Sequence, residues 1–186
     1  GVGALYVRRG VRLHKQNIGG HQERERRGGT ENVPYIVAFG KACENAKKNL
    51  DENAAHLRTL RDKFESEVGE KIQEIVFNGD RERRLPHISN ISFRRIEGEG
   101  LLINLDMQGI AVSTGSARSS GREGSSVVLQ ALGAEPDELR RVLRFSGGWQ
   151  TSEADWQALA EAVIATAEEL DRGAQPSEQT TLDRKS

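Results

Sequence analysis

The stretch Ser113-Thr114-Gly115-Ser116-Ala117-Arg118-Ser119-Ser120-Gly121 separates two elements of different type. Residues 110–112, just before it, form an apolar run typical of a strand, whereas residues 127–129 begin a short helix that Gly133 stops. Six serines, three glycines and two arginines between residues 113 and 126 predict a solvated loop. A loop that joins a strand to a helix favours a mixed fold of helices and strands.

Helical spacing recurs on both sides of this loop. One helical pattern begins near Asn32, with Pro34 in its first turn, where the missing N–H costs little. A second pattern places four large apolar residues on one face: Leu57, Leu60, Phe64 and Val68. The last predicted helix is capped by Thr151 or Ser152 and carries the apolar stripe Trp156, Leu159, Val163, Ala167 and Leu170.

Short β-prone runs alternate with these helices. Strands are predicted at residues 3–8, 75–77, 88–93 and 142–145, in addition to 110–112. A short helix from Leu101 to Gly109 and a turn of helix after Pro136 lie between them. This order indicates an α/β or α+β domain, and the pattern alone leaves its topology open. Residues 173–186 lack apolar spacing and are predicted to be a disordered tail.

The composition excludes several function classes. The 27 lysines and arginines balance 28 acidic residues, so the chain has no electrostatic signature of nucleic-acid binding. It contains no apolar run of the roughly 18 residues that a membrane helix needs, and no signal segment. Its single cysteine, Cys43, excludes an internal disulfide and a multi-cysteine metal site within this chain. We expect a cytoplasmic protein, and the missing initiator methionine suggests a fragment or a processed chain.

Residues 19–32 combine glycines, three arginines and Thr30 just before a helix. Backbone N–H groups, an arginine fork and a hydroxyl can together hold a phosphate or a carboxylate. The arginines are balanced by Glu23, Glu25 and Glu31, however, so on composition alone a salt-bridged surface loop is favoured.

Four blocks of sequence, in order, resemble the cysteine desulfurases of the NifS/IscS type, which are class V aminotransferases. Residues 19–32 are similar to the family's Gly-Gly-x-Gln-Glu-Arg-x-x-Arg-x-Gly-Thr-Glu-Asn, and residues 84–93 to its Arg-Leu-Pro-x-x-x-Asn-Ile-Ser-Phe. Residues 113–121 resemble Ser-Ser-Gly-Ser-Ala-Cys-x-Ser-Gly, and residues 144–146 match Arg-Phe-Ser. The resemblance extends from Gly1 to about Leu170, so it covers most of the chain.

The resemblance implies the C-terminal portion of a fold-type I enzyme that depends on pyridoxal phosphate. Residues 1–30 would end the large cofactor domain, and residues 31–172 would form a connecting helix and the small domain. By the same resemblance, Thr30 would reach the cofactor phosphate across a homodimer, and Arg144 would bind the carboxylate of a cysteine-like amino acid. The planar fork of an arginine suits a carboxylate. A sulfur-acceptor or scaffold protein for iron–sulfur cluster or thio-cofactor assembly is a further implied partner.

Two positions depart from the family pattern. Arg118 occupies the position of the cysteine that carries the persulfide, and a guanidinium offers no soft nucleophile for sulfur transfer. Cys43 lies in a predicted helix about 75 positions earlier and is interpreted as a packing residue rather than a substitute. After Ser146 the chain reads Gly147-Gly148-Trp149, where the family usually has Leu-Gly-Arg.

The lysine that binds the cofactor is expected outside this chain, because none of Lys15, Lys41, Lys47, Lys48, Lys63 or Lys71 lies in a matching context. Three hypotheses remain. The chain belongs to a desulfurase-like enzyme with an impaired sulfur step, to a class V aminotransferase, epimerase or lyase that needs no loop thiol, or to a non-catalytic dimerisation partner.

His87 and the block around it are assigned a structural role.

Overall fold

The computed structural model describes residues 1–114, 126–135 and 137–174. The chain divides into two compact units, Gly1–Asp51 and Glu52–Ser186. Among the described residues, no helix is long and apolar enough to cross a membrane.

In the first unit, residues 1–20 have no regular secondary structure. They lead to α1 (Gln22–Glu25), a single turn in which Glu23 and Arg24 adopt left-handed backbone angles. The predicted strand at residues 3–8 is wrong. A strand needs a neighbour for its N–H and C=O groups, and the described residues offer none at this segment. Leu5 and Tyr6 are 77% and 88% exposed as a result.

The two predicted helical patterns form one continuous helix, α2 (Val33–Lys71). Its first turn begins as the sequence indicates, since the side-chain oxygen of Asn32 accepts a hydrogen bond from the backbone N–H of Tyr35. The apolar stripe is confirmed in the second unit, where Leu57, Leu60, Phe64 and Val68 are all buried.

A four-stranded antiparallel sheet organises the second unit. Its order is β1 (Ile75–Phe77), β2 (Ile88–Phe93), β4 (Val142–Ser146) and β3 (Ser113–Thr114). Three predicted strands are thereby confirmed. The strand expected at residues 110–112 instead begins at Ser113, because it is Ser113 and Thr114 that pair with Arg144 and Leu143.

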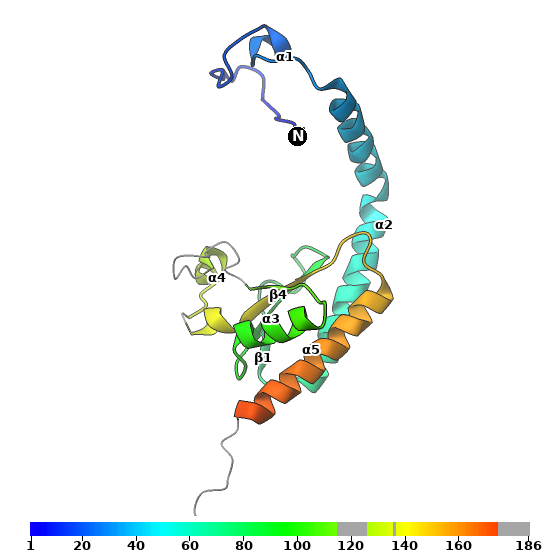
Figure 1. The fold of residues 1–186 in the computed structure, drawn as a ribbon, viewed down its shortest axis with the longest axis vertical. Coiled ribbons are helices and arrows are strands. Elements are labelled where there is room, and N and C mark those ends of the chain that lie inside the picture. The colour runs from blue at the N-terminus through cyan, green and yellow to red at the C-terminus, as the bar shows by residue number, and fades with distance from the viewer. Residues whose placement is uncertain (115–125, 136, 175–186) are drawn as a thin grey trace, which may run out of the picture. The chain divides into compact units, whose positions relative to one another are not determined.

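One face of this sheet forms the main core. Ile91 and Phe93 of β2 lie on the same face as Leu143 and Phe145 of β4, as their register requires. The helices α2, α3 (Gly98–Met107) and α5 (Glu153–Ala174) cover this face, and Figure 1 shows α5 beside α2 and α3. The ring centroid of Phe64 lies 5.2 Å from that of Phe145 and 5.2 Å from that of Trp156. Three elements thus meet at one aromatic cluster.

The opposite face of the sheet is covered only in part. Val142 packs there with Leu129 of α4 (Val127–Ala131) and Leu139 of η1 (Glu138–Arg141). Further along the same face, Asn90 is half-buried and Arg144 is exposed. The sheet therefore has an apolar face toward the helices and a polar face on which side chains remain accessible.

Two glycines end helices, and a cap begins another, at the positions that the sequence predicts. Gly109 after α3 and Gly133 after α4 have φ angles of +79° and +85°, a conformation that glycine adopts without strain. At α5, Ser152 and Asp155 form a reciprocal cap: the N–H of Asp155 donates to Ser152 Oγ, and the N–H of Ser152 donates to the Asp155 carboxylate. The hydrogen bonds from Ser152 lower the pKa of Asp155.

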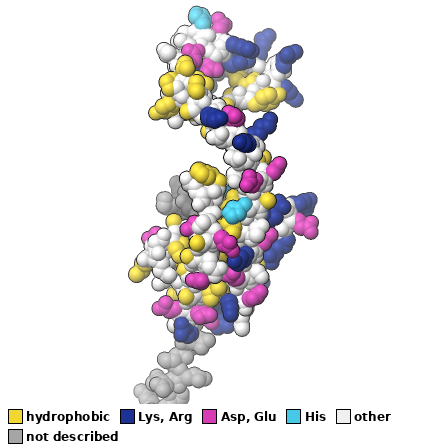
Figure 2. Space-filling view, turned by 90° about the vertical axis from the view of Figure 1, so that its right-hand side faces the viewer, with side chains coloured by type: hydrophobic (Ala, Val, Ile, Leu, Met, Phe, Trp, Pro, Cys, Tyr) yellow, Lys and Arg dark blue, Asp and Glu magenta, His cyan; other side chains and the backbone are white. Residues whose placement is uncertain are grey.

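Charged side chains of both signs are mixed over the face of the second unit shown in Figure 2. One exposed pair joins two helices, since Lys63 of α2 lies 2.8 Å from Glu153 of α5. Exposed pairs of this kind contribute little to stability because water screens them. The free energy of folding therefore depends mainly on the apolar core.

Gly147 follows β4 and lies against the indole ring of Trp156. A Cβ on Gly147 would lie 3.0 Å from Trp156 Nε1 and 3.1 Å from its Cζ2, whereas a Cβ on Gly148 would meet no atom within 4 Å. Trp156 is 4% exposed and packs on Phe64, so the ring cannot move without opening the core.

We expect Gly147→Ala to lower the free energy of unfolding by about 1–3 kcal/mol, the usual cost of overpacking a core. Urea denaturation followed by tryptophan fluorescence measures it, and Gly148→Ala is the matched control. The cost of Gly147→Ala should fall in a Trp156→Leu background, where the smaller side chain leaves room. An equal cost in both backgrounds would show that the indole ring is not the cause.

Candidate functional site

Arg144 lies at the middle of β4, on the polar face of the sheet. Its two cross-strand partners are Asn90 of β2 and Ser113 of β3, so three polar residues lie in a row across the sheet. The guanidinium makes no hydrogen bond or ion pair with another described residue, and the residue is exposed. An exposed guanidinium without a protein partner can bind a carboxylate or a phosphate with two parallel N–H groups.

Asn90, the neighbour of Arg144 on β2, is held in place by hydrogen bonds from Asn78. Asn78 Nδ2 donates to Asn90 Oδ1 at 2.7 Å and to Ser92 Oγ at 2.8 Å. The backbone N–H of Asn78 also donates to the carbonyl of Asn90 at 2.8 Å. Asn78, which directly follows β1, therefore extends the contact between β1 and β2 and holds the Asn90 side chain on the polar face.

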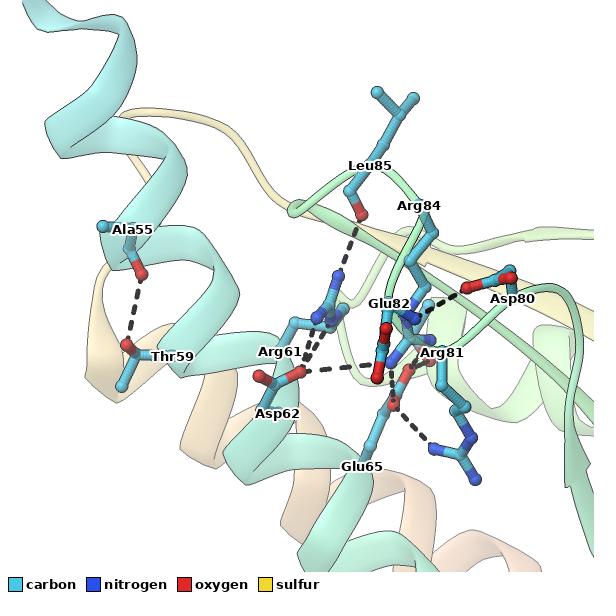
Figure 3. Close-up of polar contacts among 11 residues, drawn as sticks. Ala55, Thr59, Arg61, Asp62, Glu65, Asp80, Arg81, Glu82, Arg84 and Leu85 are labelled. Atoms are coloured by element: carbon cyan, nitrogen blue, oxygen red, sulfur yellow. Dashed lines mark hydrogen bonds and ion pairs between the residues drawn. The ribbon is translucent and has the colours of Figure 1, made fainter.

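On the face of the sheet that the helices cover, the buried carboxylate of Glu65 binds the segment that leads into β2. Figure 3 shows Glu65 of α2 facing Arg81 and Arg84. The two terminal nitrogens of Arg84 lie 2.8 and 2.6 Å from the two Glu65 oxygens, and Ser89 Oγ donates to Glu65 at 2.7 Å. Glu65 is 5% exposed and Ser89 fully buried. This bidentate pair raises the pKa of Arg84, because the carboxylate stabilises the charged guanidinium.

A second arginine reinforces the same segment. Arg61, one turn before Glu65, is 3% exposed and donates through Nη1 to the backbone carbonyl of Leu85 at 3.0 Å. Its Nε and Nη2 both donate to Oδ1 of the Asp62 carboxylate. The structural role predicted for the Arg-Leu-Pro block now has a physical account, since Arg84 and Leu85 tie the start of β2 to α2 (Figure 3).

Thr30 ends a closed loop in the first unit. Gly19 and Gly28 approach so closely that a Cβ on Gly28 would lie 2.8 Å from Gly19 Cα, and the Gly28 N–H donates to the carbonyl of Asn17. Arg27 donates to the carbonyls of Gly28 and Gly29. Thr30 itself is exposed, and its hydroxyl bonds to no described residue. The loop thus presents an exposed hydroxyl three residues before Val33, where α2 begins.

The structure describes two of the three residues predicted for the site, Thr30 and Arg144, but not Arg118. Thr30 lies exposed in the first unit, and Arg144 lies on the polar sheet face of the second. Arg118 lies outside the described residues, as does most of its loop. Cys43 is exposed on α2 rather than packed, which corrects the interpretation made for it. Among the described residues, no three acidic, histidine or cysteine side chains gather as metal ligands would.

Sequence reasoning missed Glu65 and Asn78 as functional supports. A glutamate within a charged helix is typical of a solvent face, and only the later pair Arg84 and Ser89 explains its burial. The available signal for Asn78 was its position at the end of a strand, next to Gly79 in a turn with a φ of +93°.

A family model described as aminotransferase class-V matches residues 1–159 of the chain. The chain belongs to this family. Members of the class-V aminotransferase family use pyridoxal phosphate, and the order of the sequence blocks agrees with the match.

Relatives within the family are cysteine desulfurases by name. The protein of that name from Gluconacetobacter diazotrophicus is 46% identical over 155 residues, which is 83% of this chain and 39% of the relative. The one from Nostoc sp. is 45% identical over 170 residues, which is 91% of this chain and 42% of the relative. A solved structure titled NifS-like protein superposes with a TM-score of 0.76 at 31% identity, over 89% of this chain and 42% of that one.

The fold is therefore a fragment of a NifS-like fold, and the chain spans about two fifths of the length of the curated relatives it matches. The mixed fold class and the family resemblance inferred from the sequence are both confirmed.

Removing the buried carboxylate at Glu65 tests the support beneath β2. We expect Glu65→Ala to lower the free energy of unfolding by about 3–5 kcal/mol, because it leaves the partly buried Arg84 with only the Asp62 carboxylate, 4.0 Å away, and the buried Ser89 hydroxyl without its partner. The measurement is urea denaturation monitored by Trp156 fluorescence in a Trp149→Phe background. Glu70→Ala, which removes an exposed carboxylate from the same helix, is the control. Similar losses in both variants would contradict the anchoring role.

Proposed function

We propose that this chain is the C-terminal portion of a pyridoxal-phosphate enzyme of the cysteine desulfurase type. Residues 1–30 would belong to the end of the large cofactor domain, and residues 31–172 to a connecting helix and the small domain. The tail predicted at residues 173–186 is wrong at its start, since Gly173 and Ala174 end α5, and residues 175–186 lie outside the described residues. The observation that carries the proposal is Arg144. It matches the family's Arg-Phe-Ser block and lies exposed, without an ionic partner among the described residues, on the polar sheet face.

Arg144 would bind the carboxylate of the amino-acid substrate. A guanidinium offers two parallel N–H groups, and this pair fixes both the position and the plane of a carboxylate. The antiparallel neighbours β2 and β3 hold the backbone of Arg144 on both sides, which limits the directions that its side chain can take.

The first unit has one group that fits a cofactor phosphate. The Thr30 hydroxyl is exposed and bonds to no other residue in the described part of the chain, and the loop that carries it is closed by the contact between Gly19 and Gly28. By family resemblance, Thr30 would donate to the phosphate across a homodimer. Pyridoxal phosphate, when bound, supplies an electron sink for the α-carbon of the amino acid.

The residue at position 118 decides whether the sulfur-transfer step of the family reaction can be proposed for this protein. In that reaction a protein thiolate attacks the sulfur of the substrate cysteine. The substrate C–S bond breaks as an S–S bond forms, and the β-carbon of the substrate then gains a proton to give alanine. Arg118 stands in the sequence where the family has this thiol. A guanidinium remains protonated and cannot take the sulfur. We therefore infer that persulfide formation at this position is lost.

The same substitution favours a second candidate function. Transamination, epimerisation and β-elimination use the carboxylate and phosphate contacts but require no loop thiol, so the substitution at Arg118 would be compatible with each. A third candidate is a non-catalytic partner that dimerises with an active homologue and supplies Thr30 to it. A sulfur-acceptor partner and a cytoplasmic location would be expected only if the protein has the cysteine desulfurase function.

Substitution of Arg144 tests the proposed carboxylate contact. In the complete protein with its cofactor, we expect Arg144→Ala to weaken binding of L-cysteine by about 10- to 100-fold, the value of one charged hydrogen-bonding contact. Arg144→Lys should recover part of this loss, since it keeps the charge but not the fork. The change in cofactor absorbance on adding the amino acid measures the affinity. Arg140→Ala removes an exposed charge nearby and should have no effect.

The sulfur step has its own test. Arg118→Cys in the complete protein should produce a trappable persulfide and release alanine from L-cysteine, whereas Arg118→Ser should do neither, because a hydroxyl is a poor sulfur acceptor. Persulfide labelling and alanine quantification measure the two products. Alanine release by the unsubstituted protein at the rate of the Arg118→Cys variant would refute the inferred loss.

A further inference from the structure

The residue beside Arg144 is placed to take part in the same contact. Asn90 and Arg144 are direct cross-strand partners in the antiparallel pair of β2 and β4, so both side chains project from the polar face. Directly opposed residues have Cβ atoms about 4.5–5.5 Å apart. An amide and a guanidinium at that spacing can contact the two oxygens of one carboxylate.

The orientation of the Asn90 amide is set by its neighbour. Asn78 Nδ2 donates to Asn90 Oδ1 at 2.7 Å, which occupies the oxygen end of the amide. The nitrogen end, with its two N–H donors, bonds to no described residue. Asn78 is itself fixed by its bond to Ser92 Oγ and by the backbone bond to the Asn90 carbonyl. The donor end of Asn90 is therefore free and held on the same face as Arg144.

We propose that Asn90 is a second substrate-binding residue that donates to the carboxylate bound by Arg144, and that Asn78 is the positioning residue that aims it. This proposal rests on the carboxylate-binding role proposed for Arg144. A carboxylate has about four lone-pair sites, and a guanidinium fork uses two of them. A neutral N–H donor can occupy a third without adding charge, and it would distinguish an amino acid from an amine that lacks the carboxylate.

A purely structural role would also explain the two hydrogen bonds of Asn78, because they tie the turn after β1 to β2. Ser92 separates the two possibilities. It lies on the same strand and the same face as Asn90 and shares the Asn78 bond, but its cross-strand partner is Val142. Ser92 therefore has the structural bond without the position beside Arg144.

The test compares ligands with and without a carboxylate. In the complete protein with its cofactor, the affinities of L-alanine and ethylamine are measured from the change in cofactor absorbance. Asn90→Ala should weaken L-alanine binding about 5- to 10-fold, the range of a single hydrogen bond, and leave ethylamine unchanged. Ser92→Ala removes one of the bonds that hold Asn78, so it should weaken L-alanine binding less than Asn90→Ala does and leave ethylamine binding unchanged. Asn90→Asp, which places a negative charge beside the carboxylate, should cause the largest loss.

Two further variants test how Asn90 acts. Asn78→Ala frees the amide to rotate, so we expect a loss for L-alanine smaller than that of Asn90→Ala. In an Arg144→Ala background the effect of Asn90→Ala should shrink, because the carboxylate is no longer held where the amide can reach it. Thermal denaturation of every variant shows whether a changed affinity merely reflects unfolding.

Each outcome bears on a different claim. If Asn90→Ala leaves L-alanine binding unchanged, or weakens ethylamine equally, while Arg144→Ala removes the preference for L-alanine, the role of Asn90 is refuted and that of Arg144 stands. If Arg144→Ala also leaves the preference unchanged, the proposed carboxylate site itself is wrong. A loss of affinity for L-alanine alone in Asn90→Ala, with a smaller loss in Ser92→Ala, supports the proposal.

Discussion

The second unit depends on one buried carboxylate. Glu65 receives two hydrogen bonds from the guanidinium of Arg84 and one from Ser89, and it joins a helix to the start of a strand 19 and 24 positions away. Such a pair is worth less for net stability than its short distances suggest, because both groups lose hydration on burial. Its value is positional. The direction in which the chain enters β2 decides which residues of that strand face the helices and which face the open side.

That choice of faces separates stability from chemistry. Along β2, Ile91 and Phe93 enter the core while Asn90 stays on the polar face, and along β4, Leu143 and Phe145 enter the core while Arg144 stays with Asn90. A slip of one residue in register would exchange these sets. The apolar core thus specifies the register, and the register in turn aligns the polar row of Asn90, Arg144 and Ser113.

The sequence predicted those parts that repeat with a local period. The stripe on α2, the alternation of Ile91 and Phe93 and the cap at Ser152 were all correct, because each depends on residues within a turn or two of one another. Two kinds of feature were out of reach. The segment 3–8 has the composition of a strand but no neighbour to pair with, and the burial of Glu65 requires partners from another part of the chain. Arg144 was found through family resemblance, whereas Asn78 and its bond to Asn90 emerged only from the fold.

The contact between Gly147 and Trp156 has a consequence for how this sequence can change. Where the family pattern usually has leucine, this chain has a glycine whose missing side chain leaves space for the indole. With Trp156 in place, a side chain at position 147 would meet the indole ring. The sizes of the two residues are therefore coupled in this chain: a larger residue at 147 needs a smaller one at 156.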